Sequence, residues 1–387
     1  MRFFATCAKG TEGALRRELS GLRLPAVRGD RGGVSFEGAL EAGMRACLHA
    51  RTAMRVLLEL ARFPAPDATA LYEGARAVAW QDWLDVRTTL AVEATVSSTT
   101  ITHSGFAALK VKDAVVDVLR ERLGARPDVD PKDPDVRIVL HLARDEATLS
   151  LDLAGAPLHR RGYRAVTTEA PLKETLAAAV LLLGGVDPAL PFADPMAGSG
   201  TLAIEHALRA RRIAPGLDRA FGFQRWPSYR GGPQSAWDRM KAAARAEILP
   251  RAPAPIVARD GHPKAIQALR LNAAAAGVEA DLEIAQADAR DLQPSADAGA
   301  IVTNPPYGER LGGGAEGASA AEARVAGKKL QGFYRGLAEM LARHHGWTAV
   351  LLSGNPHLER AIPLRPAVDH RLWNGPLEVH LLKYELP

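Results

Sequence analysis

The sequence predicts an α/β protein whose C-terminal part is a doubly wound, mostly parallel sheet. Three observations favour this fold class. After residue 165, apolar stretches of strand length alternate with stretches of helical periodicity, an order typical of parallel sheets. Polar and glycine-rich segments directly follow two of these strands, where such sheets bind ligands. Two last strand candidates, 368–373 and 378–385, flank an Asn-Gly-Pro turn and predict an antiparallel edge.

The composition is that of a globular protein. Of the 387 residues, 47% are hydrophobic and 24% are charged. The longest apolar run, 176–183, has eight residues, whereas a transmembrane helix needs about 18. The N-terminus turns polar too early for a signal peptide, and two cysteines cannot form a disulfide framework. We therefore expect a cytoplasmic protein, and its net charge of +5 permits nucleic-acid binding without requiring it.

The N-terminal part predicts two small mixed modules, at 1–60 and 61–155. A proline-rich loop at 126–135 interrupts the second module. The elements expected here are strands at 2–7, 33–38, 88–96, 137–143 and 148–153 and helices at 12–22 and 107–123.

The remaining residues, 165–387, predict the α/β domain, with a long insertion at 212–250. The glycine- and alanine-rich stretch 312–327 predicts a flexible loop, and a lid over the substrate is a role open to it. The expected elements are helices at 171–183, 201–211, 234–249, 263–276 and 328–345 and strands at 190–194, 255–259, 282–287, 300–303 and 347–352.

Two segments at strand ends carry the strongest chemical signals. Asn304-Pro305-Pro306-Tyr307 follows the strand at 300–303. The segment 194–201, Asp-Pro-Met-Ala-Gly-Ser-Gly-Thr, follows the strand at 190–194, and its small residues let the backbone approach a ligand. The absence of Gly-Lys-Ser/Thr argues against a phosphate-binding P-loop.

Two carboxylates follow the next strands. Asp260 can accept both hydroxyls of a ribose, and Asp288 can accept an adenine amino group. Simpler roles remain open, since Asp194 and Asp260 can cap the helices that follow them and Asp288 can be a solvated loop carboxylate.

Together these segments resemble the class I S-adenosylmethionine-dependent methyltransferases. In that family the glycine turn holds the methionine part of the cofactor, the next acidic residue holds the ribose, and a further one touches adenine. The resemblance therefore implies S-adenosyl-L-methionine as cofactor and a Rossmann-like sheet. It assigns cofactor binding to Asp194, Gly198, Gly200, Thr201, Asp260 and Asp288.

The tetrapeptide resembles the signature of the amino-methyltransferases in this family. A conjugated exocyclic amine is a poor nucleophile because its lone pair is delocalised. The Asn304 side-chain oxygen and the Pro305 carbonyl can accept its two hydrogens, and Tyr307 offers a face for stacking. Positioning then does most of the catalysis, with no metal. Adenine, cytosine, guanine and protein glutamine all remain open as acceptors.

The rest of the chain resembles the THUMP-domain RNA methyltransferases. The segments that carry this resemblance include Leu-His-Arg-Arg-Gly-Tyr-Arg at 158–164, 170–178 and 103–114. It is closest to bacterial N2-guanosine methyltransferases of 23S rRNA, which often have a second, C-terminal methyltransferase domain that these residues do not include. The resemblance implies a ferredoxin-like module, an α+β THUMP domain and methyl transfer to guanine N2 in structured RNA. We expect rRNA, with tRNA as the alternative and protein glutamine or DNA less favoured.

Basic residues in these segments are the candidates for RNA contact, although each is also explained as a solvated surface charge. Lys110 and Lys112 are two apart, so they do not share a helix face. The eleven histidines show no metal-ligand spacing, and we expect no metal. The predicted RNA-binding residues are Lys110, Lys112, Arg160, Arg161 and Arg164.

Overall fold

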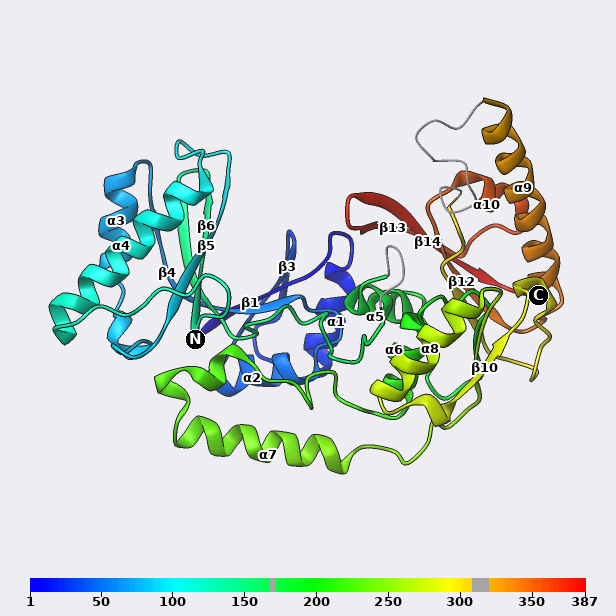
Figure 1. The fold of residues 1–387 in the computed structure, drawn as a ribbon, viewed down its shortest axis with the longest axis horizontal. Coiled ribbons are helices and arrows are strands. Elements are labelled where there is room, and N and C mark those ends of the chain that lie inside the picture. Colours follow the sequence, from blue (N-terminus) through cyan, green and yellow to red (C-terminus); the bar gives the residue numbers. More distant parts are fainter. Residues whose placement is uncertain (167–171, 308–319) are drawn as a thin grey trace. The chain divides into compact units, whose positions relative to one another are not determined.

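The computed structural model describes residues 1–166, 172–307 and 320–387, with the side chains of 320–326 left aside (Figure 1). These residues form two compact units. The first unit contains Met1–Cys7, Leu15–Leu158 and Gly216–Ala246, and the second contains Ala8–Ala14, His159–Pro215 and Glu247–Pro387. In the described residues, no helix has both the length and the apolar character needed to cross a bilayer.

The first unit is built on one continuous seven-stranded sheet with the order β2-β3-β1-β4-β7-β6-β5. Only β5 and β6 pair in parallel; the other neighbours are antiparallel. The sequence does not predict β4, which crosses residue 60 and pairs with both β1 and β7. The strands are β1 (Arg2–Thr6), β2 (Arg28–Asp30), β3 (Gly33–Glu37), β4 (Arg55–Pro64), β5 (Leu90–Ser97), β6 (Val136–Ala143) and β7 (Glu146–Asp152).

The helices of this unit bury one apolar face each, as the spacing of their leucines and valines predicts. In α4, a histidine cap at His103 opens the helix and Gly124, with a φ of 76°, ends it. The helices are α1 (Glu12–Gly21), whose first residues belong to the second unit, α2 (Leu40–His49), α3 (Ala68–Arg76), α4 (Ser104–Leu123) and α7 (Gly232–Ala246).

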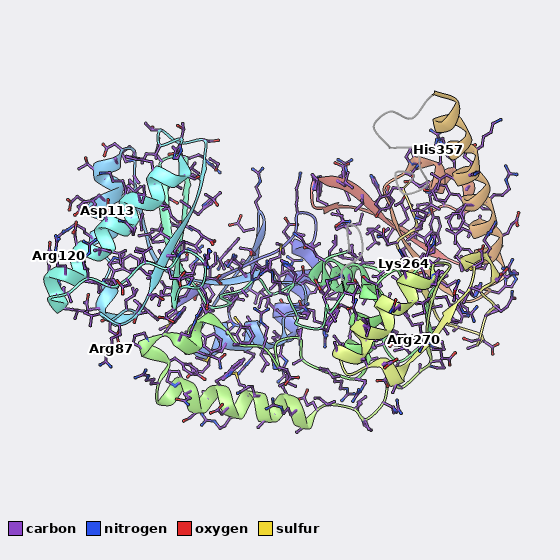
Figure 2. All side chains as sticks on the ribbon, in the orientation of Figure 1. Arg87, Asp113, Arg120, Lys264, Arg270 and His357 are labelled. Atoms are coloured by element: carbon purple, nitrogen blue, oxygen red, sulfur yellow. The ribbon has the colours of Figure 1, made fainter. Side chains whose placement is uncertain are left out.

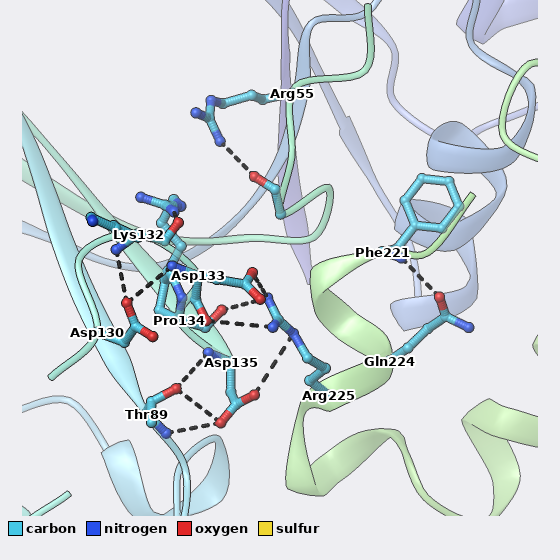
Figure 3. A network of polar contacts seen from close by, with 12 residues as sticks. Arg55, Thr89, Asp130, Lys132, Asp133, Pro134, Asp135, Phe221, Gln224 and Arg225 are labelled. Atoms are coloured by element: carbon cyan, nitrogen blue, oxygen red, sulfur yellow. Dashed lines mark hydrogen bonds and ion pairs between the residues drawn. The ribbon is translucent and has the colours of Figure 1, made fainter. Parts of the chain in front are cut away.

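The insertion at 216–246 folds with the first unit, although the sequence places it within the range 165–387. Phe221 and Phe223 pack edge-on against Trp237, at 5.4 and 5.1 Å between ring centroids. Arg225 donates to Asp133 Oδ1 at 3.0 Å and to the Pro134 carbonyl at 2.6 Å, which ties the insertion to the proline-rich loop (Figure 3).

The second unit contains a seven-stranded sheet with the order β10-β9-β8-β11-β12-β14-β13. The first five strands are parallel, and β14 pairs antiparallel with β12 and β13, as the sequence predicts. The strands are β8 (Phe192–Asp194), β9 (Ile256–Asp260), β10 (Leu282–Gln286), β11 (Ala300–Thr303), β12 (Thr348–Ser353), β13 (Val368–Asn374) and β14 (Leu377–Glu385).

Helices cover both faces of this sheet. Ala300 and Val302 of β11 belong to a core cluster with α5, α6 and α8, whereas Ile301 belongs to a second cluster with α9 and α10. This alternation is what a strand buried on both faces requires. The helices are α5 (Glu174–Leu183), α6 (Thr201–Ala210), α8 (Pro263–Ala275), α9 (Ala320–Ala342) and α10 (Pro356–Ala361).

One expectation is wrong at the start of α9. The sequence predicts a loop through residue 327, but the helix begins at Ala320. Its first turns are rich in alanine, glutamate and arginine, whose helix propensity outweighs the glycine at 327. The lid expected in this region falls largely on 308–319, which lie outside the described residues.

Candidate active site

Four of the predicted site residues lie at one edge of the second sheet. Asp194 and Asp260 are the last residues of β8 and β9, Asn304 directly follows β11, and Asp288 lies two residues after β10. These strands are adjacent in the order β10-β9-β8-β11. Because parallel strands end at the same edge, the fold brings these polar groups together as the strand-end rule predicts.

The glycine turn after β8 has a backbone that only glycine adopts easily. Gly198 and Gly200 have φ values of +55° and +90°, in the left-handed region. A Cβ on Gly200 would lie 2.1 Å from Leu269 Cδ1, so this glycine lets α6 approach α8. The turn is also attached to β9, since Ala197 N–H donates to the Arg259 carbonyl at 2.8 Å.

Asp194 is buried at the base of the turn, with 1% of its surface exposed. Its Oδ1 accepts a hydrogen bond from Thr303 Oγ1 at 2.8 Å and from Met196 N–H at 3.2 Å. Burial, with a smaller contribution from the Asp260 charge, raises the pKa of Asp194 to about 7. Through Thr303, Asp194 joins the glycine turn to the strand that carries the tetrapeptide.

Asp260 connects the glycine turn with the start of α8. Its Oδ2 accepts from Gly198 N–H and its Oδ1 accepts from His262 N–H, each at 2.9 Å. A carboxylate oxygen has two lone pairs, so each oxygen retains one acceptor position.

Asp288 is held by its near neighbour Arg290. Its Oδ1 accepts from Arg290 Nε at 2.8 Å and its Oδ2 from Arg290 Nη2 at 2.6 Å. This pairing lowers the pKa of Asp288 to about 2. Asp288 also caps the short helix at Ala289–Asp291. In this structure Asp288 therefore acts as a loop carboxylate. This is the role that the sequence leaves open as the alternative to adenine recognition.

The tetrapeptide is fixed by contacts from two neighbouring elements. Tyr334 of α9 donates to the Pro306 carbonyl at 2.6 Å, and Asn355, after β12, donates through Nδ2 to the Tyr307 carbonyl at 2.9 Å. Within the loop, the Tyr307 hydroxyl donates to Asn304 Oδ1. Pro305 is buried between these half-buried residues.

Sequence reasoning did not identify several of these residues. Thr303 and Asn355 are polar residues at or after the ends of buried strands, so the strand-end rule could have found them. Gly354 leaves room for the Tyr307 ring, because a Cβ there would lie 2.9 Å from it. Tyr334 lies on a helix and gives no comparable signal.

The predicted RNA-binding arginines differ in their surroundings. Arg160 is exposed, whereas the Arg161 side chain is only 4% exposed and pairs with buried Glu205 at 3.4 Å. The Arg164 side chain is 17% exposed and pairs with Glu174 at 2.9 Å. These arginines line a cavity of about 530 Å³ together with His159, Lys173 and Glu174. Burial, and then the charges of Lys173 and the arginines, lower the pKa of His159 to about 4.

The two lysines of α4 also differ. Lys112 pairs with Asp113 at 2.6 Å, whereas Lys110 Nζ lies 5.8 Å from the centre of the exposed Phe106 ring. Asp113 and Arg120 are further charged residues along this helix (Figure 2). Among the residues that the structure describes, no cluster of three or more histidine, cysteine or acidic side chains could hold a metal ion.

The fold and the site together define a methyltransferase domain that follows a ferredoxin-like and a THUMP domain. Three family models match the chain: the RlmL ferredoxin-like domain at residues 2–57, the THUMP domain at 65–152 and the RMKL-like methyltransferase domain at 161–383. The last match covers more than half of the chain, so the chain belongs to the RMKL-like methyltransferase family. The resemblance and the fold class predicted from the sequence are confirmed.

Individual proteins show how far the similarity extends. The chain is 44% identical over 401 residues to the ribosomal RNA large subunit methyltransferase K/L of Syntrophotalea carbinolica, covering 100% of this chain and 54% of the relative. Identity to the same-named protein of Pseudomonas aeruginosa is 42%, covering 99% and 52%. The chain thus spans about half the length of these relatives. Among solved structures, SMU.472, described as a methyltransferase and complexed with SAH, matches with a TM-score of 0.88, 28% identity and coverage of 100% and 98%.

Proposed function

We propose that this protein transfers a methyl group from S-adenosylmethionine to the exocyclic N2 amine of a guanine in large-subunit rRNA. One observation carries the proposal: the Thr303–Asp194 hydrogen bond joins the Asn-Pro-Pro-Tyr loop to the glycine turn. An amine-binding loop and a cofactor-binding turn thereby share one sheet edge. The relatives named as rRNA methyltransferases support the choice of rRNA.

The residues at the sheet edge fit S-adenosylmethionine. Among the described residues, apart from Gly198 and its two chain neighbours, no heavy atom lies within 4 Å of a Cβ built on Gly198, so the backbone there is open to a ligand. The free acceptor positions of Asp260 suit two ribose hydroxyls. The methionine part of the cofactor would be held by Gly198, Gly200 and Thr201, with Asp194 buried at the base of their turn. Asp288 would accept the adenine amino group if its carboxylate bound Arg290 and the adenine at the same time. The cofactor supplies an electrophilic methyl group.

The tetrapeptide would orient the acceptor. Asn304 Oδ1 and the Pro305 carbonyl accept the two hydrogens of the amine, which directs its lone pair at the methyl group. Asn304 Oδ1 already accepts from Tyr307, and its second lone pair remains for the amine. The Tyr307 ring, placed against Gly354, offers its face to the base. Transfer would leave S-adenosylhomocysteine and a cationic amine, which would then lose a proton to water.

The N-terminal unit favours RNA over the other acceptors. The THUMP domain at 65–152 is the part of the chain that resembles an RNA-binding module, and transfer to protein glutamine or DNA would not require it. Lys110 and the exposed Arg160 would contact phosphates, and tRNA remains the second candidate substrate. Work on ribosomal RNA would place the protein in the cytoplasm.

The test is a comparison of acceptors with labelled S-adenosylmethionine. The purified chain is incubated with 23S rRNA from a strain that lacks the corresponding gene, and separately with tRNA, double-stranded DNA and total protein. We expect label in 23S rRNA alone, and none with the Asn304→Ala variant. Label in tRNA, DNA or protein but not in rRNA would contradict the proposed substrate.

A further inference from the structure

The segment Tyr163–Val166, here called the linker strap, lies against the glycine turn within the second unit. Tyr163 is buried, and its hydroxyl donates to Glu205 Oε1 at 3.2 Å. Glu205 is on α6, the helix that the glycine turn opens. The first residue of the strap is therefore held to α6 by a buried hydrogen bond.

Arg164 extends from the strap to the end of the glycine turn and to the start of α5. Its Nη1 donates to Ser199 Oγ at 3.4 Å, and its Nη2 donates to Thr201 Oγ1 at 3.2 Å and to the Leu172 carbonyl at 3.0 Å. Its Nε donates to Glu174, whose side chain is 4% exposed. The planar guanidinium thus joins the last residues of the turn to the start of α5, a geometry that lysine cannot reproduce.

Asn272 of α8 holds the other end of the strap. It is 1% exposed and uses three hydrogen bonds. Its Oδ1 accepts from Val166 N–H at 3.0 Å, and its Nδ2 donates to the Val166 carbonyl at 3.2 Å and to the Ser199 carbonyl at 3.0 Å. One buried amide therefore binds both the strap and the turn, and any displacement of Val166 or Ser199 leaves a buried polar group without its bond.

We propose that Arg164 and Asn272 are positioning residues of the cofactor-binding turn, and that the linker strap sets the turn's conformation. The proposal rests on the function proposed above. It differs from the role that the sequence predicts for Arg164, contact with an RNA phosphate. Two left-handed glycines give the turn little stiffness of its own, so bonds at Ser199 and Thr201 decide how well it is ordered before cofactor binds.

Arg164→Lys separates the two roles because lysine keeps the charge that a phosphate needs but loses the fork that reaches Ser199, Thr201 and Glu174. Asn272→Asp is the second variant, in which a carboxylate oxygen replaces the Nδ2 donor. Arg270→Lys is the matched control. Arg270 also lies on α8 (Figure 2), but its partners are outside the turn, since it donates to the Ile284 carbonyl at 3.1 Å and pairs with Glu279 at 3.8 Å.

Two measurements are made on the full chain. Calorimetry gives the Kd for S-adenosylhomocysteine, and amide hydrogen exchange without ligand gives the protection of residues 197–202. We expect Arg164→Lys to raise Kd about 10-fold, equivalent to about 1.4 kcal/mol, and to speed exchange in the turn. RNA affinity should stay within about twofold, and Arg270→Lys should change nothing. Asn272→Asp should also raise Kd and speed exchange in the turn.

A folded Arg164→Lys variant with unchanged Kd and unchanged exchange would overturn the proposal. So would an Arg164→Ala variant that loses RNA affinity while its Kd and its exchange stay at the wild-type values, which would identify Arg164 as a phosphate ligand. If the wild-type protein binds no S-adenosylhomocysteine, the proposed function fails, while hydrogen exchange still decides whether the strap orders the turn.

Discussion

Replacing Asp194 by asparagine should make the protein more stable at alkaline pH and leave it unchanged at acidic pH. Asp194 is buried, and burial raises its pKa from 3.8 to about 7. Asparagine has nearly the same shape and keeps the oxygen that accepts from Thr303 and Met196. The variant therefore removes the buried charge while it preserves these two bonds.

The size of the effect follows from the pKa difference between the folded and unfolded states. Below pH 4 both states bind the proton. As the pH rises from about 4 to 7, the unfolded state loses its proton first, so the free energy of unfolding falls. A shift of about three pKa units corresponds to a loss of about 4 kcal/mol above pH 7. This is an upper limit, because structural relaxation around the charge reduces the cost.

The assay is urea unfolding of the cofactor-free protein at pH 3.5 and pH 8. We expect the Asp194→Asn midpoint to be close to that of wild type at pH 3.5 and to exceed it clearly at pH 8. The control is Asp238→Asn on α7, because the Asp238 side chain is 60% exposed and should respond alike at both pH values. Equal midpoints of wild type and Asp194→Asn at pH 8 would refute the reasoning.

Three further predictions concern the same sheet edge. Asn304→Ala should leave the Kd for S-adenosylmethionine within about twofold and lower kcat on the order of 10²–10³-fold, as calorimetry and methyl transfer would measure, because it removes the acceptor for the substrate amine and for the Tyr307 hydroxyl but no group that would hold the cofactor. Asp260→Ala should weaken cofactor binding by roughly 1.5–3 kcal/mol for each charge-assisted bond lost, and an unchanged Kd would reduce Asp260 to a structural role. Gly200→Ala should lower the urea midpoint, since the new Cβ would meet Leu269 at 2.1 Å, and Leu269→Ala should recover part of the loss.

The strand-end rule made much of this site predictable. Asp194, Asp260 and Asn304 are far apart in the sequence, yet each follows a short apolar strand, and parallel strands end at one edge. Pattern alone also predicts the antiparallel pair β13 and β14. These features depend on local periodicity, which the sequence displays directly.

Other features depend on long-range contacts that no local pattern encodes. Arg161 and Arg164 belong to a basic run that is typical of an exposed surface, but Glu205 and Glu174 pair with them from helices that follow later. Likewise, Arg225 ties the aromatic insertion to Asp133 in the proline-rich loop of the first unit, and no local pattern in the insertion predicts that partner.

The most direct test of the proposed chemistry is the identity of the methylated nucleoside. Undermethylated 23S rRNA is treated with the purified chain and S-adenosylmethionine, digested to nucleosides and analysed by mass spectrometry against standards. The account predicts N2-methylguanosine, formed by the wild-type protein and absent with Asn304→Ala. N6-methyladenosine or N4-methylcytidine in its place, or N2-methylguanosine formed equally well by the Asn304→Ala variant, would contradict it.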